Sequence, residues 1–265
     1  MSTTQPIGIF DSGVGGTSIW REVHELLPFE KTIYLADSKN APYGEKPIEQ
    51  IKNLSRKNTE KLLDMGAKII IVACNTATTN AIKELRNEYS IPFIGIEPAI
   101  KPAALKSKSK TIGILATRGT LTSTLFSQTS DFYAKNINIV EVEGRGIVEL
   151  IEAGELDSPQ MRSLLLKLLE PFFVNRIDYL VLGCSHYPYL IPLLKELLPE
   201  DVIVIDSGEA VARQTKSILS SNNLLANEQT VEKPVPEFFS NTNPKVLEQL
   251  TEALKYAYKV SYLDF

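Results

Sequence analysis

Short apolar runs alternate along the chain with longer stretches in which apolar residues recur every three or four positions. The short runs are rich in β-branched and aromatic residues, which is typical of buried strands, and the longer stretches have the period of amphipathic helices. We predict strands at 7–10, 32–36, 69–73, 92–95, 112–115, 137–142, 179–183 and 202–205, and a further strand near 237–239. We predict helices at 16–27, 47–65, 77–89, 98–105, 120–134, 146–153, 158–174, 188–198, 208–221 and 243–257.

This alternation favours parallel sheets that are joined by right-handed crossovers and covered by helices. The run Ile7–Asp11 is similar to Ile112–Ala116, because each is an apolar strand that leads into a polar turn. We therefore expect an α/β fold of two pseudo-symmetric lobes, each a mostly parallel sheet flanked by helices, which could face each other across a cleft. Residues 1–97 and 208–265 are expected to form lobe A, and residues 98–207 lobe B.

Two polar stretches are expected to be surface loops. Residues 106–110 alternate Lys and Ser, and they are a candidate linker between the two halves of the chain. Residues 220–236 are rich in Ser, Asn, Glu and Pro and precede the last predicted strand.

The overall composition is that of a folded protein, with 43% hydrophobic and 23% charged residues. The formal net charge of −4 gives no basic surface for nucleic acid, so we predict no nucleic-acid partner. No segment approaches 18 uninterrupted apolar residues, and the N-terminus lacks a basic stretch followed by an apolar one, so we predict no membrane association and a cytoplasmic location.

The two cysteines occupy matching places in the two halves. Cys74 ends the apolar run 69–73 and Cys184 ends the run 179–183, and each is followed by small polar residues. Ligands bind at this edge of open α/β sheets, so two thiols could flank one ligand from opposite sides. Buried inert thiols remain an alternative, and a disulfide is rare in reducing cytosol.

Other polar segments follow the predicted strands. Asp11–Gly16 is a glycine-rich turn before a helix, which suits a carboxylate or phosphate or is a plain tight turn. The loop from Asp37 and Ser38 to Tyr43 and Gly44 suits a cover over a cleft or a proline turn with a packed tyrosine. His186 lies near Cys184, but Cys-x-His without further ligands is poor evidence for zinc, and we predict no metal site.

Seven blocks of sequence together resemble the glutamate racemase family, in the family's order and across most of the chain. They are Asp11–Gly16, Pro42–Gly44, Ala73–Ala77, Gly95–Pro98, Ala116–Thr120, Leu182–Pro188 and Asp206–Ala210. The resemblance implies two α/β lobes with the active site in the cleft between them. It also implies a cofactor-independent isomerase that interconverts L-glutamate and D-glutamate for peptidoglycan synthesis, with a homodimer expected.

The resemblance also implies roles for single residues. Cys74 would take the α-proton from D-glutamate and Cys184 from L-glutamate, and Asp11 and His186 would assist the two thiols. The substrate-binding residues implied are Asp11, Ser12, Tyr43, Gly44, Asn75, Thr76, Thr117, Ser185 and His186. Possible auxiliary residues are Asp37, Ser38, Thr120 and Glu152. Inversion needs two groups, because a single base tends to return the proton to its own face.

The chain departs from the family pattern in two places. Ser185 replaces the usual threonine but keeps the hydroxyl. Glu143-Gly144-Arg145 replaces Ala-Cys-Pro, so we expect the local wall of the site to differ from the family's. An aspartate racemase, a non-catalytic carboxylate-binding protein and a thiol redox protein are the competing functions. The last lacks the Cys-x-x-Cys motif that it would need.

Overall fold

Two parallel sheets form the framework of the computed structural model, which describes residues 2–227, 233–252 and 257–265. In the first sheet the described strands follow the order β10-β9-β2-β1-β3-β4, and in the second β6-β5-β7-β8. Neighbouring strands in the described ranges pair in parallel. The bounds are β1 (Ile7–Asp11), β2 (Thr32–Ala36), β3 (Ile69–Val72), β4 (Phe93–Gly95), β5 (Thr111–Ala116), β6 (Asn138–Glu143), β7 (Tyr179–Gly183), β8 (Ile203–Ile205), β9 (Glu237–Ser240) and β10 (Lys259–Tyr262).

Helices cover both faces of each sheet. They are α1 (Thr17–Leu26), α2 (Ile48–Asp64), α3 (Asn75–Glu88), α4 (Ile100–Lys106), α5 (Arg118–Leu121), α6 (Thr124–Ala134), α7 (Ile147–Glu152), α8 (Pro159–Val174), α9 (Ile191–Leu197), α10 (Gly208–Ser221) and α11 (Lys245–Thr251). Short 3-10 turns are η1 (Ser38–Asn40), η2 (Tyr43–Glu45) and η3 (Tyr187–Leu190). This architecture confirms the predicted α/β fold. None of the helices in the described ranges is long and apolar enough to cross a membrane.

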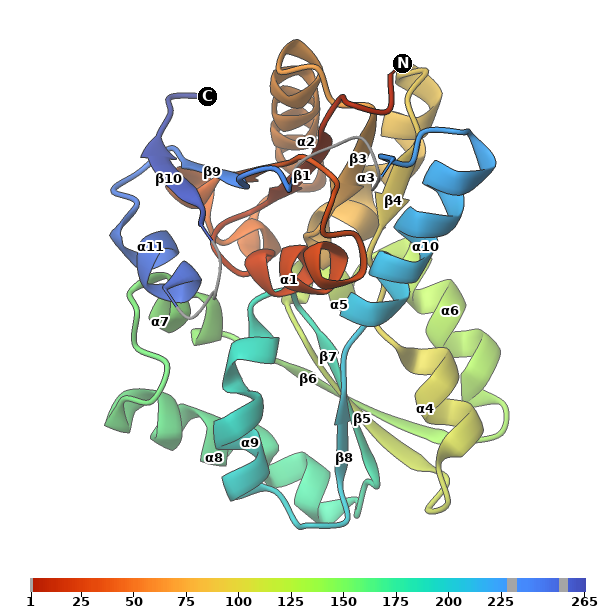
Figure 1. Cartoon of the computed structure of the whole chain (residues 1–265). Helices are drawn as coiled ribbons and strands as arrows, with labels where there is room; N and C mark the ends of the chain where they lie inside the picture. The colour runs from red at the N-terminus through yellow and green to blue at the C-terminus, as the bar shows by residue number, and fades with distance from the viewer. Residues whose placement is uncertain (1, 228–232, 253–256) are drawn as a thin grey trace.

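One apolar core connects the two sheets. It joins β1 and β3 through α1 to α8 and α9 on the second sheet, and Figure 1 shows α1 lying between the two halves. Two smaller cores lie on the outer faces, one beneath α2 and α3 and the other beneath α4 and α6. The main core therefore packs the two sheets against each other in this structure.

Several predicted elements differ in detail. The helix predicted at 120–134 is broken at Ser123, whose hydroxyl accepts the backbone N–H of Phe126 and so begins α6 anew. The helix predicted at 188–198 begins as η3, and the helix predicted at 243–257 ends at Thr251, before residues 253–256, which lie outside the described ranges. In the loop predicted at 220–236, residues 228–232 also lie outside those ranges.

The strand β10 was not predicted, and residues 106–110 are not the linker between the two halves that we predicted. β10 is an edge strand with mostly exposed residues, so it lacks the apolar signal of a buried strand. The loop after α4 is held by Asp178, which accepts the backbone N–H groups of Lys108 and Ser109. Since α4 already packs on β5 and β7, this loop lies within the second half and does not separate the two halves.

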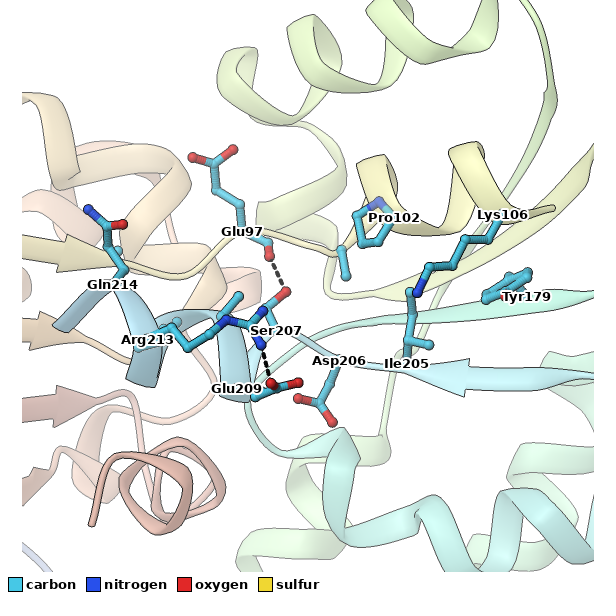
Figure 2. A pocket seen from close by; sticks show the side chains of 14 residues that line it. Glu97, Pro102, Lys106, Tyr179, Ile205, Asp206, Ser207, Glu209, Arg213 and Gln214 are labelled. Carbon is cyan, nitrogen blue, oxygen red and sulfur yellow. Dashed lines mark hydrogen bonds and ion pairs between the residues drawn. The ribbon is translucent and has the colours of Figure 1, made fainter. Parts of the chain in front are cut away.

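The chain crosses between the sheets twice, from β4 to α4 and from β8 to α10. The two crossings lie side by side and are joined by Ser207, whose hydroxyl donates to the backbone oxygen of Glu97 over 2.5 Å. Figure 2 shows the cavity of about 440 Å³ that they line, with Lys106 and Arg213 among its walls. The cavity is lined by none of the predicted site residues.

Candidate active site

The carboxyl ends of four strands bring the predicted residues together. Asp11 ends β1, Cys74 follows β3, Thr117 follows β5 and Cys184 follows β7. The Ser185 hydroxyl, beside Cys184, donates to Asp11 Oδ1 over 2.9 Å. This buried bond joins the ends of the two sheets.

Cys74 sits at the start of a long helix. It is the N-cap of the 14-residue helix α3, its Sγ accepts the backbone N–H of Ala77 over 3.4 Å, and its thiol donates to Ser12 Oγ over 3.6 Å. Only 4% of the residue is exposed. Burial, followed by the charge of Asp11, raises the pKa of the Cys74 thiol far above its ordinary value and outweighs these two hydrogen bonds. In this structure Cys74 is therefore the protonated partner at neutral pH.

Cys184 has a different partner. Its Sγ lies 3.8 Å from Nδ1 of His186, and the residue is 7% exposed. The helical turn that follows, η3, has only four residues, so the helix dipole available to Cys184 is small. Cys184 is therefore next to the charged imidazole of His186, whereas Cys74 is next to the N-terminus of a long helix.

His186 is fully buried and paired with Glu152. Its Nε2 donates to Glu152 Oε1 over 2.6 Å. Burial lowers the pKa of His186, but the hydrogen bonds to Cys184 and Glu152 and the charge of Asp11 outweigh it, so the pKa lies well above its ordinary value. Burial conversely raises the pKa of Glu152, and the bond to His186 outweighs it and lowers the net pKa. The pair is thus an imidazolium and a carboxylate.

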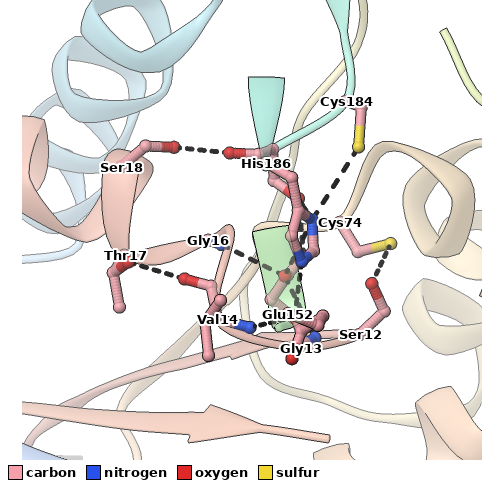
Figure 3. A network of polar contacts seen from close by, with 12 residues as sticks. Ser12, Gly13, Val14, Gly16, Thr17, Ser18, Cys74, Glu152, Cys184 and His186 are labelled. Carbon is pink, nitrogen blue, oxygen red and sulfur yellow. Dashed lines mark hydrogen bonds and ion pairs between the residues drawn. The ribbon is translucent and has the colours of Figure 1, made fainter. Parts of the chain in front are cut away.

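The glycine-rich turn binds anions, but the anions are the protein's own side chains. The N–H groups of Gly13 and Gly16 donate to Asp11 Oδ2, and that of Val14 donates to Glu152 Oε1 over 2.7 Å. A Cβ at Gly13 would lie 1.8 Å from Glu152 Oε1. A Cβ at Gly15 would lie 2.2 Å from Nδ1 of His186, so these two glycines admit the pair. Figure 3 shows this network, with both cysteine sulfurs beside it.

Asp11 influences Cys74 through charge and not through a direct hydrogen bond. Its oxygens are occupied by the turn and by Ser185, and its Oδ2 lies 3.9 Å from Nδ1 of His186. Burial raises the pKa of Asp11 and outweighs the lowering by His186 and Ser185. Ser12 is the direct hydrogen-bond partner of Cys74.

Hydroxyl groups that follow strands of both sheets meet beside the two cysteines' strand ends. Thr76 Oγ1 lies 2.7 Å from Thr117 Oγ1 and 3.3 Å from Thr120 Oγ1, and the last two are 3.1 Å apart. Gly44 packs so closely against Thr117 that an added Cβ would lie 2.7 Å from its Cβ. The loop of Gly44 therefore closes over these hydroxyls.

Asn75 has an amide with no partner among the described residues. The residue is 2% exposed, and neither Oδ1 nor Nδ2 makes a hydrogen bond. An unpaired buried amide costs free energy, so such a group is usually kept for a ligand. Its position beside Cys74 makes it the clearest open polar group at the site.

The phenol of Tyr43 points to Asp37. It donates to Asp37 Oδ2 over 2.5 Å and accepts from Asn58 Nδ2 over 3.0 Å. The same carboxylate accepts from Asn40 and from Asn241. Tyr43 and Asp37 thus brace the loop, and their polar groups are already paired.

Sequence reasoning missed several residues of this network. Tyr34 donates to the backbone oxygen of Gly13 over 2.7 Å, and Tyr187 donates to that of Gly144 over 3.1 Å. An added Cβ at Gly144 would lie 2.2 Å from the Tyr187 hydroxyl, so the departure at 143–145 makes room for this ring. Tyr34 belongs to no motif, and Tyr187 lies within the block Leu182–Pro188 but was given no role there.

The site is closed in this structure. Both thiols are nearly shielded from solvent, and a hollow of only about 20 Å³ touches Gly44 and Thr117. Glu45 and Arg145 also line this hollow and form an exposed ion pair at 3.8 Å, here called the Glu45–Arg145 mouth. Within the described ranges, no group of three His, Cys, Asp or Glu side chains could hold a metal ion.

Comparisons with known proteins give a consistent result. The model of the Asp/Glu/Hydantoin racemase family matches residues 7–215. A glutamate racemase of Pseudomonas paraeruginosa is 44% identical over 250 residues, which are 94% of this chain and 93% of that protein. The structure of a glutamate racemase from Bacillus anthracis has a TM-score of 0.87 at 30% identity and covers 99% of this chain and 98% of its own. That of the Escherichia coli glutamate racemase, in complex with L-glutamate and the activator UDP-MurNAc-ala, has a TM-score of 0.84 at 32% identity and 97% coverage of both chains.

Proposed function

The chain belongs to the Asp/Glu/Hydantoin racemase family, and from that premise we propose that it interconverts L-glutamate and D-glutamate with two thiols as acid and base. The observation that carries the proposal is the pair of buried cysteines at the carboxyl ends of β3 and β7, joined through Ser12, Asp11 and His186. Each thiol comes from a different sheet. A substrate between them would present opposite faces of its α-carbon to the two sulfurs.

The reaction needs a base on one face and an acid on the other. From L-glutamate, the Cys184 thiolate takes the α-proton, the C–H electron pair stays on the α-carbon, and the Cys74 thiol delivers its own proton to the other face. The reverse direction exchanges the two roles. The balance is one proton removed and one delivered, and no redox partner is needed.

The resting arrangement suits the first of these directions. Cys74 holds its proton because burial and Asp11 disfavour the thiolate, whereas the Sγ of Cys184 lies 3.8 Å from Nδ1 of the protonated His186. Glutamate binding exchanges water and side chains around both sulfurs, and the order of protonation can then invert. This makes His186 the group that assists Cys184, and Asp11 and Ser12 those that assist Cys74.

Substrate recognition is assigned to neutral donors. We assign the open amide of Asn75, the hydroxyls of Thr76, Thr117 and Ser185, and the Tyr43–Gly44 segment to the two carboxylates and the amino group. Fixed dipoles of this kind hold the charge and stabilise the carbanion-like transition state without reorganising. Thr120 supports the hydroxyl cluster, and Glu152 with Ser38 positions His186.

Entry of glutamate requires the two halves to separate at the Glu45–Arg145 mouth, because both thiols are shielded in the closed form. We place the boundary between the moving lobes at residues 97–98 and 207–208, where the chain crosses between the sheets. The enzyme would act as a homodimer in the cytoplasm, without a cofactor, and supply D-glutamate for peptidoglycan.

A racemisation assay tests the proposal. Purified protein is given L-glutamate, D-glutamate, L-aspartate and D-aspartate in separate reactions, and loss of optical rotation is followed in the presence of EDTA. The proposal predicts that both glutamate solutions reach the same racemic end point and that aspartate turns over far more slowly. Turnover of aspartate alone would show that aspartate, and not glutamate, is the substrate. No turnover of either acid would reject the racemase activity.

A further inference from the structure

The C-terminal part of the chain contributes to the site from outside the racemase family match. That match ends at residue 215, yet β9 pairs with β2 in the first sheet, and Asn241 follows β9 directly. Asn241 is 4% exposed. Its place in the sheet brings it to the loop that follows β2.

Both ends of the Asn241 amide are used on that loop. Its Nδ2 donates to Asp37 Oδ1 over 2.5 Å, and its Oδ1 accepts the backbone N–H of Lys39 over 2.9 Å. The backbone N–H of Asn241 also donates to the oxygen of Ala36. These contacts fix the backbone on both sides of Ser38.

Ser38 is the residue through which the loop contacts the ion pair of Glu152 and His186. Its hydroxyl donates to Glu152 Oε2 over 2.8 Å, and Glu152 Oε1 accepts from His186 Nε2. His186 in turn contacts the Sγ of Cys184. The path from Asn241 to the thiol therefore runs through the backbone of the loop, the two hydrogen bonds of Glu152 at 2.8 and 2.6 Å, and the 3.8 Å contact of His186 with Cys184.

We propose that Asn241 is a positioning residue for the racemase reaction, acting through Ser38 and Glu152 on His186. The inference rests on the proposed function, because it assigns the effect to proton transfer at Cys184. An amide suits this place because Asp37 needs a donor and the Lys39 N–H needs an acceptor, and asparagine supplies both from one side chain. A carboxylate would lose the donor, and an apolar side chain would lose both.

A purely structural role makes a different prediction. If Asn241 only stabilised the fold, its removal would lower the melting temperature and leave turnover by the folded fraction unchanged. The positioning role requires a lower kcat in fully folded protein. It also requires that the loss depend on Ser38.

The test compares Asn241→Ala and Asn241→Asp with Asn243→Ala, an exposed asparagine of the same segment. We expect kcat for L-glutamate to fall on the order of tenfold in Asn241→Ala, the effect of losing one hydrogen bond to a charged group, with KM changed less than kcat. Asn241→Asp keeps the Lys39 contact but faces Asp37 with a second carboxylate, so it should also lose kcat. Asn243→Ala should match the wild type.

A double-mutant cycle with Ser38→Ala then identifies the route. If Asn241 acts through Ser38, the double variant loses no more kcat than the worse single variant, whereas independent effects multiply. Unchanged kcat in both Asn241 variants, or multiplied losses in the cycle, would overturn the inference. Wild-type turnover is measured in the same series, so its absence would reject the proposed function instead. Should Asn241→Ala fail to fold, Asn241→Asp carries the same cycle.

Discussion

The two halves of the molecule place a thiol at equivalent strand ends but surround it differently. Cys74 begins a 14-residue α-helix, has neutral donors in Ser12 and the Ala77 N–H, and faces the negative charge of Asp11. Cys184 begins only a short helical turn and instead contacts His186, an imidazolium held by Glu152. Similar backbones thus carry unlike electrostatics.

Under the proposed mechanism, this difference would let a pseudo-symmetric fold hold one proton between two equal groups. Two identical environments would give two thiols or two thiolates, and neither state can invert a carbon by proton transfer. Burial and Asp11 keep Cys74 protonated, whereas Cys184 lies 3.8 Å from Nδ1 of the charged His186, so the two sulfurs have unlike surroundings. The asymmetry cannot bias the outcome, since enantiomers have equal free energy and kcat/KM must be equal in the two directions.

The largest effects are expected from removing either sulfur. Cys74→Ala and Cys184→Ala should each lose racemisation by more than about 1,000-fold, the scale of a missing general acid or base. Each variant should still exchange the α-hydrogen of one enantiomer with solvent, L-glutamate in Cys74→Ala and D-glutamate in Cys184→Ala. Proton NMR in D₂O measures the exchange. Exchange of the same enantiomer by both variants would contradict the assignment of faces.

Removing the imidazole should disturb one thiol more than the other. In His186→Asn we expect kcat/KM to fall about 100-fold in both directions, because Cys184 loses the cation that stabilises its thiolate. The primary isotope effect with α-deuterated glutamate should rise for the L-enantiomer alone. The control is His24→Asn, the other histidine of the chain, which stacks on Trp20 in α1. Equal isotope effects for both enantiomers would count against the pairing.

The ion pair of His186 and Glu152 should appear in the pH dependence of stability. The pKa of Glu152 is lowered from 4.5, so its contribution is complete above that pH and is lost as the pH falls through the folded value. The pKa of His186 is raised from 6.5, so its contribution is complete below that pH and is lost as the pH rises through the folded value. The full contribution therefore lies between about pH 4.5 and pH 6.5.

Thermal or denaturant unfolding of Glu152→Gln checks this window. We expect the variant to be less stable than the wild type by about 2 kcal/mol within it, with the gap closing above and below. Glu149→Gln, an exposed glutamate of the same helix α7, is the matched control and should show no such window. A gap that is independent of pH would mean that Glu152 acts by packing and not by charge.

The smallest effect is expected at the Cys74 hydrogen bond. Ser12→Ala removes the acceptor of the Cys74 thiol, and kcat/KM should fall about threefold, the scale of one neutral hydrogen bond. The primary isotope effect should rise for α-deuterated D-glutamate only, the reverse of the result for His186→Asn. A rise for the L-enantiomer would place Ser12 with the wrong thiol.

Much of the fold follows from local sequence, because buried parallel strands such as 69–72 and 179–183 are almost wholly apolar and end at polar turns. The edge strand β10 has no such signal, and the break at Ser123 depends on a capping bond that competes with a continuous helix. Local patterns also predicted the glycine-rich turn as an anion site. They could not show that Asp11 and Glu152 already fill it.

Some residues of the site were also predictable from the local sequence, and others were not. The motifs around Cys74 and Cys184 were visible in the sequence because each follows a strand. Asn241 and Tyr34 were not, since each reaches the site by the lateral order of strands in the sheet, which no local pattern encodes. Residues that reach the site from distant segments can be found only once the three-dimensional structure is known.

Solvent-isotope labelling during a single direction of turnover tests the two-thiol account most directly. L-Glutamate is incubated with the wild-type enzyme in D₂O, and both enantiomers are separated and analysed by mass spectrometry at a few per cent conversion. The account predicts deuterium at the α-carbon of nearly all D-glutamate formed and almost none in the remaining L-glutamate, because the delivering sulfur carries a solvent-derived hydrogen. D-Glutamate that keeps the original hydrogen would contradict it.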